Sequence, residues 1–554
     1  MRKILYFIIL SFCLVACTKE EDLTEYYNRA EQLEAANQTQ AQKNQELEAA
    51  NEQLKKQALL LQATLDSLAK AIEKQSTPPV LVAMAFSAAE NPILTEDLIC
   101  EISGSGTIEC WLPQYSGSKE LIPRFSFLGT EITINGVKAT SGTTKYDFSS
   151  PVKLEVKSGG KTVEYQVYVY NYTGLPIMRI DTEGGQDIVS KTVYLNAHMS
   201  LTEDLVTRGP GETVEADLQI KGRGNSTWGQ PKKPYRLKFN EKVALLGEHK
   251  DKSWVLIANY PDKSMIRNDL ALTMGKRSLL DWTPSGHYVE LILNGEYNGT
   301  YLLCEKIKVS NHRVAVGDDG FIIEVDERAM GDSSCVYFYA PHINYSIEIK
   351  EPEDVSFGDE NYNYIANFIQ MADDALFSEN FTDPQEGWQK YMDIDSFVDW
   401  YLIHEISKNE DSMFHFSTYM NLKRGGKLKM GPIWDFDIAF GNVKEAGSEA
   451  MLPEGFMLEW SLWYQRLMQD PAFLSKLRQR FIYFYNHKDD FIAYINQDAH
   501  YLKYAAQENQ NRWGTFYHYT YKQYDIWGSY QNEVQNLKEW FNSRMEWMKK
   551  AYGI

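Results

Sequence analysis

The first periodic pattern along the chain is a seven-residue repeat of leucine. Residues 21–75 contain neither glycine nor proline, and leucine recurs there at one position of the repeat. These leucines are Leu33, Leu47, Leu54, Leu61 and Leu68. The spacing predicts a coiled-coil helix over residues 18–77, a stalk about 80 Å long that joins two or three copies of the chain. Asparagine at several companion positions leaves a single solvated helix or a disordered spacer as alternatives.

Residues 80–172 show a different pattern, in which apolar and polar residues alternate. Residues 131–134 and 152–156 are examples, and turn signals such as Asn135-Gly136 separate the runs. Short strands that are divided by turns predict a β-sandwich. The segment resembles the immunoglobulin-like modules of bacterial surface lipoproteins, and we expect it to act as a spacer. Cys100 and Cys110 could form a disulfide after export or stay as buried thiols.

The remainder, residues 175–554, combines strand patterns with helical ones. Up to about residue 350 the chain reads mostly as strands, whereas residues 361–377, 394–408 and 532–551 have helical apolar spacing. A strand-rich lobe followed by a helix-rich lobe predicts an α+β domain with a cleft between the lobes. We therefore expect the chain to be a multidomain α+β protein.

Composition and charge exclude two classes of protein. Of the 554 residues, 56 are Lys or Arg and 76 are Asp or Glu, which gives a formal charge of -20. Such an acidic surface repels a phosphate backbone, so we expect no nucleic-acid partner. Hydrophobic residues make up 44% of the chain, which is enough for packed cores and excludes global disorder.

The N-terminus has the features of an export signal. Two basic residues precede an apolar run, residues 4–16, which is too short to span a membrane but suits the core of a signal peptide. The run ends in Leu14-Val15-Ala16-Cys17, which resembles the lipobox of bacterial lipoproteins. The resemblance implies that residues 1–17 are the signal peptide and lipobox of a Gram-negative outer-membrane lipoprotein, anchored through a lipid on Cys17. The acidic stretch that follows favours display on the cell surface; an ordinary cleaved signal peptide is the alternative.

One local segment departs from the acidic character of the chain. Residues 221–239 contain six basic residues, and three glycines lie among them. Glycines let backbone N–H groups approach a ligand, and clustered cations favour an anion. Arg236 and Lys238 alternate along an expected strand, so their side chains leave the same face. The segment predicts an anion site, with an ordinary basic hairpin as the alternative.

Acidic residues that suit a metal ion lie further along the chain. The run of residues 427–437 is expected to bring a strand to Asp435 and Asp437, and their spacing puts both on one side of an extended backbone. Two such carboxylates suit Mg²⁺, which is commonly held by one or two carboxylates together with phosphate and water. Asp411, on a separate loop, could accept a hydroxyl proton. For each carboxylate, a turn or capping role is the ordinary alternative.

Several short motifs occur in one order along the second half of the chain. They include Arg223-Gly224-Asn225-Ser226-Thr227-Trp228, Asp262-Lys263-Ser264, Ile266-Arg267-Asn268, Lys350-Glu351-Pro352 and Trp434-Asp435-Phe436-Asp437. On these motifs, residues 175–545 resemble the bacterial spore-coat protein H (CotH) kinase family. The resemblance implies that residues 175–554 form a two-lobed, atypical protein-kinase-like domain.

The resemblance also implies an activity. A kinase of this family would transfer the γ-phosphoryl group of ATP, with Mg²⁺ or Mn²⁺, to a serine or threonine hydroxyl of a protein, whose identity the sequence does not reveal. It implies that Asp411 is the catalytic aspartate, that Asp435 is the first metal ligand and that Asp437 is the second. Asp435-Phe436 is followed by aspartate instead of glycine, so the assignments of ordinary kinases do not transfer directly.

The nucleotide contacts are assigned by analogy with the layout of kinases. Lys238 would contact phosphate, and Glu305 would be its ion-pair partner. Arg223 and Asn225, in the glycine-rich segment, are also expected to bind the nucleotide. Arg223 competes with Lys238 for the phosphate, as do Lys221 and Lys233.

Two other functions fit the sequence. A binding protein could keep the fold without the transfer chemistry and display a cleft rich in Trp and Tyr to glycans or proteins. A hydrolase would use Glu324, Asp326 and Asp435 as paired carboxylates for glycosidic cleavage. The sequence has no Gly-x-Ser-x-Gly or His-Glu-x-x-His motif, which argues against a serine hydrolase and a zinc protease.

Overall fold

The computed structural model describes residues 78–554 apart from five short gaps, and part of residues 35–62. The gaps are residues 95–96, 113–118, 204–212, 444–447 and 521–524. The chain divides into two compact units, Met1–Cys110 with Ser118–Val169 and Trp111–Gly117 with Tyr170–Ile554. None of the described helices is both long and apolar enough to cross a membrane.

The described positions between residues 35 and 62 are helical. Leu47, Leu54 and Leu61 are exposed there. Cys17 and the signal segment, residues 1–17, lie outside the described residues, as do Leu33 and Leu68. The coiled coil, the homodimer or homotrimer and the lipid anchor therefore stay predictions.

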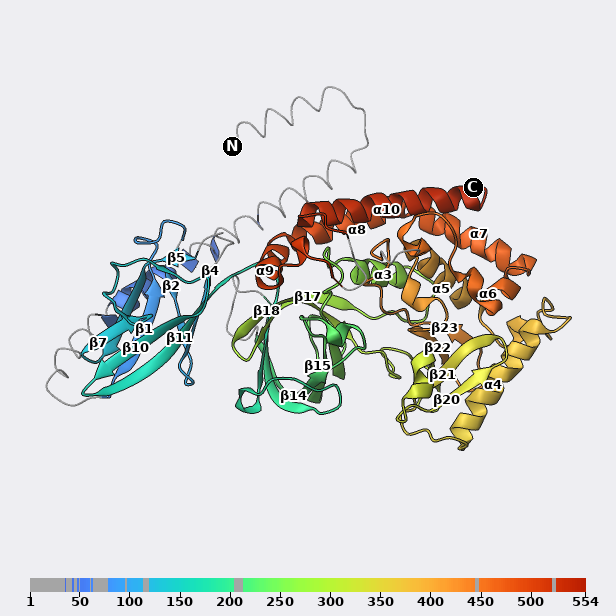
Figure 1. The fold of residues 1–554 in the computed structure, drawn as a ribbon, viewed down its shortest axis with the longest axis horizontal. Coiled ribbons are helices and arrows are strands. Elements are labelled where there is room, and N and C mark those ends of the chain that lie inside the picture. Colours follow the sequence, from blue (N-terminus) through green and yellow to red (C-terminus); the bar gives the residue numbers. More distant parts are fainter. Residues whose placement is uncertain are drawn as a thin grey trace, which may run out of the picture. The chain divides into compact units, whose positions relative to one another are not determined.

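The first unit is built of β-strands (Figure 1). Their bounds are β1 Val80–Phe86, β2 Leu98–Ile99, β3 Glu101–Ile102, β4 Thr107–Leu112, β5 Glu120–Leu121, β6 Pro123–Leu128, β7 Glu131–Ile134, β8 Val137–Lys138, β9 Tyr146–Asp147, β10 Val152–Ser158 and β11 Lys161–Asn171. They form sheets of order β2-β1-β6, β3-β4-β11-β10-β7-β8 and β5-β9. Cys100 and Cys110 are buried free thiols, and the hydrogen bond between them raises the pKa of Cys100.

Strand β10 shows why this part of the sequence forms strands. Val152, Leu154 and Val156 are buried, whereas Lys153 and Glu155 leave the other face and pair there, with Nζ 2.9 Å from Oε1. Alternation with a period of two therefore separates a buried face from a solvated one. The strands expected at residues 131–134 and 152–156 are confirmed, and the immunoglobulin-like assignment stays a prediction.

The second unit begins with a closed barrel (Figure 1). Its strands are β12 Ile177–Thr182, β13 Leu195–Thr202, β14 Thr213–Gly222, β15 Tyr235–Val243, β16 Asp251–Ile257, β17 Gly286–Leu293 and β18 Glu296–Glu305. They follow the order β12-β13-β14-β15-β16-β18-β17, in which β12 and β17 pair in parallel and the other pairs are antiparallel. Leu237, Trp254 and Leu303 belong to the apolar core of the barrel.

A five-stranded antiparallel sheet follows the barrel. Its strands are β19 Phe321–Val325, β20 Tyr337–Ala340, β21 Ile343–Glu351, β22 Thr418–Leu422 and β23 Leu428–Met430, in the order β20-β21-β19-β22-β23. Because β22 and β23 come from the half that we expected to be mostly helical, the division into a strand-rich and a helix-rich half is not strict. The mixed α+β class is confirmed, and two kinase-like lobes stay a prediction.

The helices of the second unit are α3 Arg267–Lys276, α4 Glu360–Phe377, α5 Ile394–Ser407, α6 Leu462–Leu467, α7 Pro471–Asn486, α8 Lys488–Tyr501, α9 Lys503–Trp513 and α10 Tyr530–Ala551. Helices α4, α5 and α10 coincide with the three segments of helical spacing. Asp359, Asp393 and Ser529 cap their first turns by accepting a backbone N–H three residues along. Local capping and apolar periodicity together explain why these helices begin where they do.

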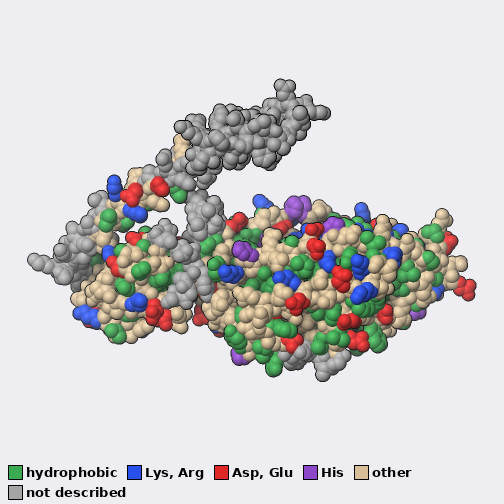
Figure 2. Space-filling view, turned by 90° about the horizontal axis from the view of Figure 1, so that it is seen from above, with side chains coloured by type: hydrophobic (Ala, Val, Ile, Leu, Met, Phe, Trp, Pro, Cys, Tyr) green, Lys and Arg blue, Asp and Glu red, His purple; other side chains and the backbone are tan. Residues whose placement is uncertain are grey.

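Helix α10 packs against α5, α8 and α9, and a buried ion pair joins it to α5 (Figure 1). Arg544 of α10 and Glu405 of α5 are both fully buried, and Nη2 lies 2.9 Å from Oε2. Glu405 also accepts the backbone N–H groups of Met457 and Leu458. On the face shown in Figure 2, acidic and basic side chains of this unit are interspersed and form no large patch of one sign.

Candidate active site

One cavity of the second unit contains most of the residues that the sequence singled out. Its volume is ≈ 360 Å³, and its lining combines the glycine-rich segment, the turn after β16, strands β19 and β21, and the segments around residues 411 and 435. Five of the expected site residues line it together, namely Arg223, Asn225, Asp411, Asp435 and Asp437.

Asp435 lies on the loop after β23, and its backbone is held from two sides. Its φ of 69° falls in the left-handed region that residues other than glycine rarely adopt. Asn409 donates its side-chain N–H to the Asp435 carbonyl oxygen over 2.9 Å, and Asn268 accepts the N–H of Phe436 over 2.8 Å. Ser417 Oγ donates to Asp435 Oδ2 over 3.3 Å. These contacts fix the direction in which Asp435 presents its carboxylate.

Three carboxyl groups, those of Asp411, Asp435 and Asp437, line this part of the cavity. Asp437 is buried, and burial raises the pKa of its carboxyl well above the usual range. The charges of Asp435 and Asp411 raise this pKa further, and the Arg223 guanidinium opposes the shift. A divalent cation relieves such repulsion, and carboxylate oxygens are the ligands that Mg²⁺ and Mn²⁺ prefer. The donor set therefore fits a divalent metal, which Asp435 and Asp437 would hold.

The loop that carries Asp435 is also tied to the start of α3. Arg267 is buried and pairs with buried Asp262, with Nη1 2.6 Å from Oδ1. Arg267 Nε donates to the Ala439 carbonyl oxygen over 3.1 Å, four residues beyond Asp435. Asp262 also accepts the N–H and the hydroxyl of Ser264. The motif at residues 262–268 thus supports the acidic loop without lining the cavity, and the charge of Asp262 contributes to the raised pKa of Asp437.

The glycine-rich segment contributes a tight turn and a cation. Gly224 has a φ of +82°, and a Cβ at this position would lie 2.2 Å from Thr227 Oγ1, so a larger residue would strain the backbone and displace the Thr227 side chain. Lys191 Nζ donates to the Gly224 carbonyl oxygen over 2.9 Å and holds the turn. Arg223 stacks on Trp434, with its guanidinium carbon 5.5 Å from the ring centroid. The stacking leaves the polar edge of the guanidinium for an anion.

The expected ion pair between Lys238 and Glu305 is wrong, and neither residue lines the cavity. Glu305 pairs with Arg313 instead, with Oε1 3.3 Å from Nε. In the barrel, Trp254 stands opposite both Leu237 and Glu305, so Glu305 shares their inward face. Lys238, the neighbour of Leu237, is exposed on the opposite face because side chains alternate along a strand.

Other lysines of the glycine-rich segment already have partners. Lys221 lies over an aromatic ring, and Lys233 donates to a backbone carbonyl of the same segment. Lys232 lines the cavity, but its Nζ donates to Asn509 Oδ1 over 2.8 Å and to the Thr300 carbonyl oxygen. Burial lowers the pKa of Lys232 to about 7. Lys232 therefore anchors this segment to α9.

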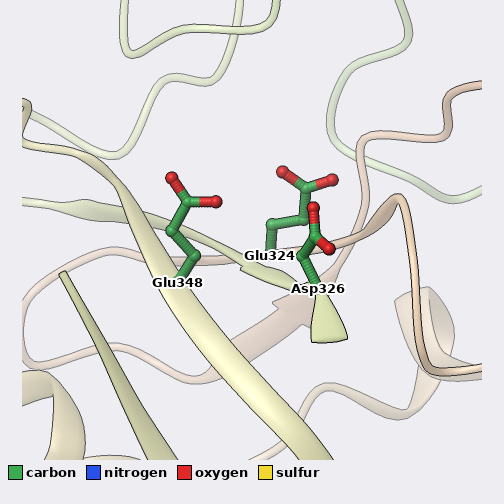
Figure 3. A group of neighbouring side chains, drawn as sticks. All are labelled: Glu324, Asp326 and Glu348. Atoms are coloured by element: carbon green, nitrogen blue, oxygen red, sulfur yellow. The ribbon is translucent and has the colours of Figure 1, made fainter. Parts of the chain in front are cut away.

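A second group of charged side chains lies at the cavity, and the sequence did not predict it as a group. Glu324 and Glu348 stand opposite each other on β19 and β21, and Asp326 directly follows β19 (Figure 3). One oxygen from each lies within 4.8 Å of the others. Lys350 Nζ is 3.0 Å from Glu348 Oε1 and 3.3 Å from Glu324 Oε2. Arg328 donates to both oxygens of Asp326, over 2.8 and 2.9 Å.

Each carboxylate of this second group therefore has a cation. Burial raises the pKa of Glu324 to about 7, although the charge of Lys350 opposes the shift. Because the Lys350 ammonium lies next to both Glu324 and Glu348, the group lacks the open donor set of a metal site. The sequence could show that residues 324 and 326 share one face of a strand, and that residues 348 and 350 do so on another. It could not show that β19 pairs with β21, which brings the four side chains together.

Comparison with known families identifies the domain. The family model described as CotH kinase protein matches residues 220–548, which is more than half of the 554 residues. The chain belongs to the CotH kinase protein family. The resemblance that the sequence motifs indicated is thereby confirmed, and every residue that lines the cavity lies within the matched CotH segment.

Comparison with individual proteins adds little to the CotH assignment. No curated protein matches the chain. A crystal structure from Bacteroides thetaiotaomicron VPI-5482, described as that of a candidate glycoside hydrolase, is 16% identical to this chain. The likeness covers 52% of this chain and 77% of that one, with a TM-score of 0.17. A TM-score this low supports no argument about the fold or the activity of the CotH domain.

Proposed function

We propose that the chain is an atypical protein kinase that transfers the γ-phosphoryl group of ATP to a serine or threonine hydroxyl of a protein. The observation that carries the proposal is the convergence of Asp411, Asp435 and Asp437 in one cavity with the Arg223 guanidinium. Phosphoryl transfer depends on positioning and on neutralising charge, so it requires metal carboxylates, cations and a group that accepts a proton. Membership in the CotH kinase protein family supports the same activity.

In this mechanism Asp411 accepts the proton of the acceptor hydroxyl. The hydroxyl oxygen forms a bond to the γ-phosphorus as the bond from phosphorus to the β–γ bridging oxygen breaks, and ADP leaves with that oxygen. Asp435 and Asp437 would hold Mg²⁺ or Mn²⁺, which supplies charge neutralisation at the phosphates when bound. Arg223 and the backbone at Asn225 orient the phosphates for an in-line displacement.

Transfer of radiolabelled γ-phosphate tests this function. The purified protein is incubated with labelled ATP, Mg²⁺ or Mn²⁺ and a generic protein acceptor. We expect labelling that Asp411→Ala and Asp435→Ala abolish. Lys429→Met is the control, because Lys429 pairs with Asp281 and does not line the cavity. Labelling that survives in both aspartate variants would contradict the proposal. Absence of labelling together with no nucleotide-induced rise in Tm would favour a non-catalytic module that binds glycans or proteins.

Glycosidic cleavage is the second candidate, because Glu324, Asp326 and Asp435 all line the same cavity. Burial raises the pKa of Glu324 to about 7, which suits a general acid. Lys350 and Arg328, however, engage Glu324 and Asp326, and a glycosidase gives no role to the cationic glycine-rich segment. Phosphoryl transfer therefore gives a role to more of the residues that line the cavity than glycosidic cleavage does. Release of reducing sugar from glycans by the wild type, but not by Glu324→Gln, would reverse this order.

We also propose that the kinase is tethered to the outer membrane of a Gram-negative cell and faces the cell surface. The lipobox at Cys17 and the acidic residues after it support this location, and the leucine repeat supports a dimeric or trimeric stalk. Cys17→Ala should move the protein from the membrane fraction to the soluble fraction. Cross-linking of the full chain should give dimers or trimers, and purely monomeric protein would contradict the coiled coil.

A further inference from the structure

Four of the described residues that line the cavity are cationic, and three of them have recognisable roles. Lys232 is fully buried and bound to Asn509 and to a backbone carbonyl. Arg328 chelates Asp326 with two parallel hydrogen bonds. Arg223 stacks on an aromatic ring and faces the metal carboxylates. The fourth cation, Lys350, belongs to β21, and its role remains to be explained.

The ammonium group of Lys350 has donor capacity to spare. It lies 3.0 Å from Glu348 Oε1 and 3.3 Å from Glu324 Oε2. An ammonium carries three N–H donors, so these two contacts leave one for a ligand. The side chain is 35% exposed, compared with 6% for Glu324, so the free donor is accessible from the cavity that Lys350 lines.

The sheet holds this ammonium in one place and keeps it charged. Glu324 and Glu348 stand opposite each other on adjacent strands, and Lys350 is two residues from Glu348 on the same face. Burial on its own would lower the pKa of Lys350, but Glu324 and Glu348 outweigh burial and raise this pKa above its usual range. A fixed, permanently charged donor is what recognition of a phosphate requires.

Lys350 and Arg223 lie near the same pair of side chains. Tyr419 on β22 stands opposite Glu324. Arg223 and Tyr419 line the same cavity, and the Arg223 guanidinium opposes the rise that burial and Glu324 cause in the pKa of the Tyr419 phenol. Two cations around one Tyr–Glu pair form a site for an anion with several negative charges.

We propose that Lys350 is the lysine that contacts the phosphates of the bound nucleotide, and that Glu324 and Glu348 hold its ammonium in place. This inference rests on the proposed kinase function and assigns to Lys350 the role that sequence analogy gave to Lys238. The ligand class is a nucleoside triphosphate, held between Lys350 on β21 and Arg223 on the glycine-rich segment.

Equilibrium binding by the full chain tests this assignment, with ATP as one probe and adenosine, which lacks phosphates, as the other. Lys350→Met should weaken ATP binding by roughly 10- to 100-fold, the loss of one hydrogen bond to a charged group, and leave adenosine binding unchanged. Lys429→Met is the matched control. Lys429 is an ion-paired lysine of the same sheet with a 33% exposed side chain, and its variant should bind ATP as the wild type does.

A second variant separates the loss of a contact from the loss of the fold. Lys350→Met leaves Glu324 and Glu348 without their cation, whereas the double variant Lys350→Met/Glu324→Gln removes one charge of each sign. The double variant should lose less Tm than Lys350→Met, because only Glu348 stays without its cation, and it should show the same selective loss of ATP affinity. Wild-type ATP affinity in both variants would overturn the Lys350 assignment and leave the kinase function standing. Equal losses for ATP and adenosine in the double variant would also overturn it, because they report a damaged cavity. A wild-type chain that binds no ATP would overturn both proposals.

Discussion

Two groups of carboxylates lie at the cavity of the CotH domain, and they differ in what neutralises them. The loop carboxylates are Asp411, Asp435 and Asp437, and the strand carboxylates are Glu324, Asp326 and Glu348. The strand carboxylates have Lys350 and Arg328 as ion-pair partners. Burial and the charges of Asp435 and Asp411 raise the pKa of Asp437, although the Arg223 guanidinium opposes the rise. We therefore expect a metal at Asp435 and Asp437 and not at the strand carboxylates, whose oxygens already contact lysine or arginine.

The largest effect is expected where a carboxylate is fully neutralised and fully buried. Arg267→Met leaves Asp262 charged and alone in the interior, where the two side chains are 1% and 0% exposed. The free energy of unfolding should fall by about 3–5 kcal/mol, as measured by urea denaturation. The double variant Asp262→Asn/Arg267→Met should lose less, because no unpaired charge remains. A single variant that loses under about 1 kcal/mol would contradict the importance of this pair.

The loop carboxylates should behave in the opposite way, with a large effect on activity and little on stability. Asp435→Asn should reduce the rate of phosphoryl transfer by roughly 10²- to 10³-fold, since a group that neutralises developing charge is lost. The Tm should stay the same or rise, because a repulsion with Asp437 is removed. Initial rates and thermal denaturation measure the two quantities. A large fall in Tm would show that Asp435 is structural.

Metal addition compares the two groups directly. At a concentration of 100 times Kd, Mn²⁺ or Mg²⁺ should stabilise the wild type by about 2.7 kcal/mol, and EDTA should remove this gain. Asp435→Asn/Asp437→Asn should show no such gain, whereas Glu324→Gln/Glu348→Gln should keep it. Thermal denaturation with and without EDTA gives the measurement. Loss of the gain only in the strand variant would place the metal at the strand carboxylates.

A third carboxyl pair, Asp269 and Asp498, lies away from the cavity lining, and one of its members has a strongly raised pKa. Burial raises the pKa of Asp498 to about 8, and neighbouring Asp269 contributes to the rise; Tyr494 donates to Asp269 Oδ2 over 2.5 Å. The folded state thus binds the Asp498 proton more tightly than the unfolded state, whose pKa is about 3.9. Stability should fall as pH rises from about 4 to 8, by at most about 1.4 kcal/mol per pH unit for this group. Asp498→Asn should flatten the decrease of Tm between pH 5 and 8, and an unchanged slope would contradict this origin.

The smallest effect is expected for an exposed ion pair. Lys429 Nζ lies 2.8 Å from Asp281 Oδ1, and the two side chains are 33% and 52% exposed. Lys429→Met should lower the free energy of unfolding by less than about 1 kcal/mol, since water already solvates both charges. Urea denaturation measures the difference. A larger loss would show that the exposed fraction of the two side chains does not predict how much an ion pair of this sheet contributes to the free energy of unfolding.

The sequence predicted those features that depend on residues close together along the chain. Asp435, Asp437 and Arg223 lie in short motifs, so the sequence alone indicated that they take part in the same chemistry. Helices α4, α5 and α10 were predicted because helical apolar spacing repeats within a few residues. Both kinds of signal are contained in a single segment of the chain.

The expected pair of Lys238 and Glu305 is wrong because it depends on how distant strands align. Trp254 stands opposite both Leu237 and Glu305, which puts Glu305 on the other face from Lys238. In the same way, Lys350 meets Glu324 only through the register of β19 and β21. Strand order and register connect distant segments, and a shift of one residue reverses which face a side chain occupies. No local pattern in the sequence carries that information.

The buried pair of Glu405 and Arg544 has a consequence for the timing of maturation. The two residues are 139 positions apart, and α5, which carries Glu405, leads directly to Asp411. Until the ribosome has delivered residue 544, the segment that presents the proposed catalytic aspartate lacks its guanidinium support. We therefore expect a nascent or truncated polypeptide without Arg544 to leave the Glu405 carboxylate unpaired, so that the α5 segment reaches its final arrangement only when synthesis has passed α10.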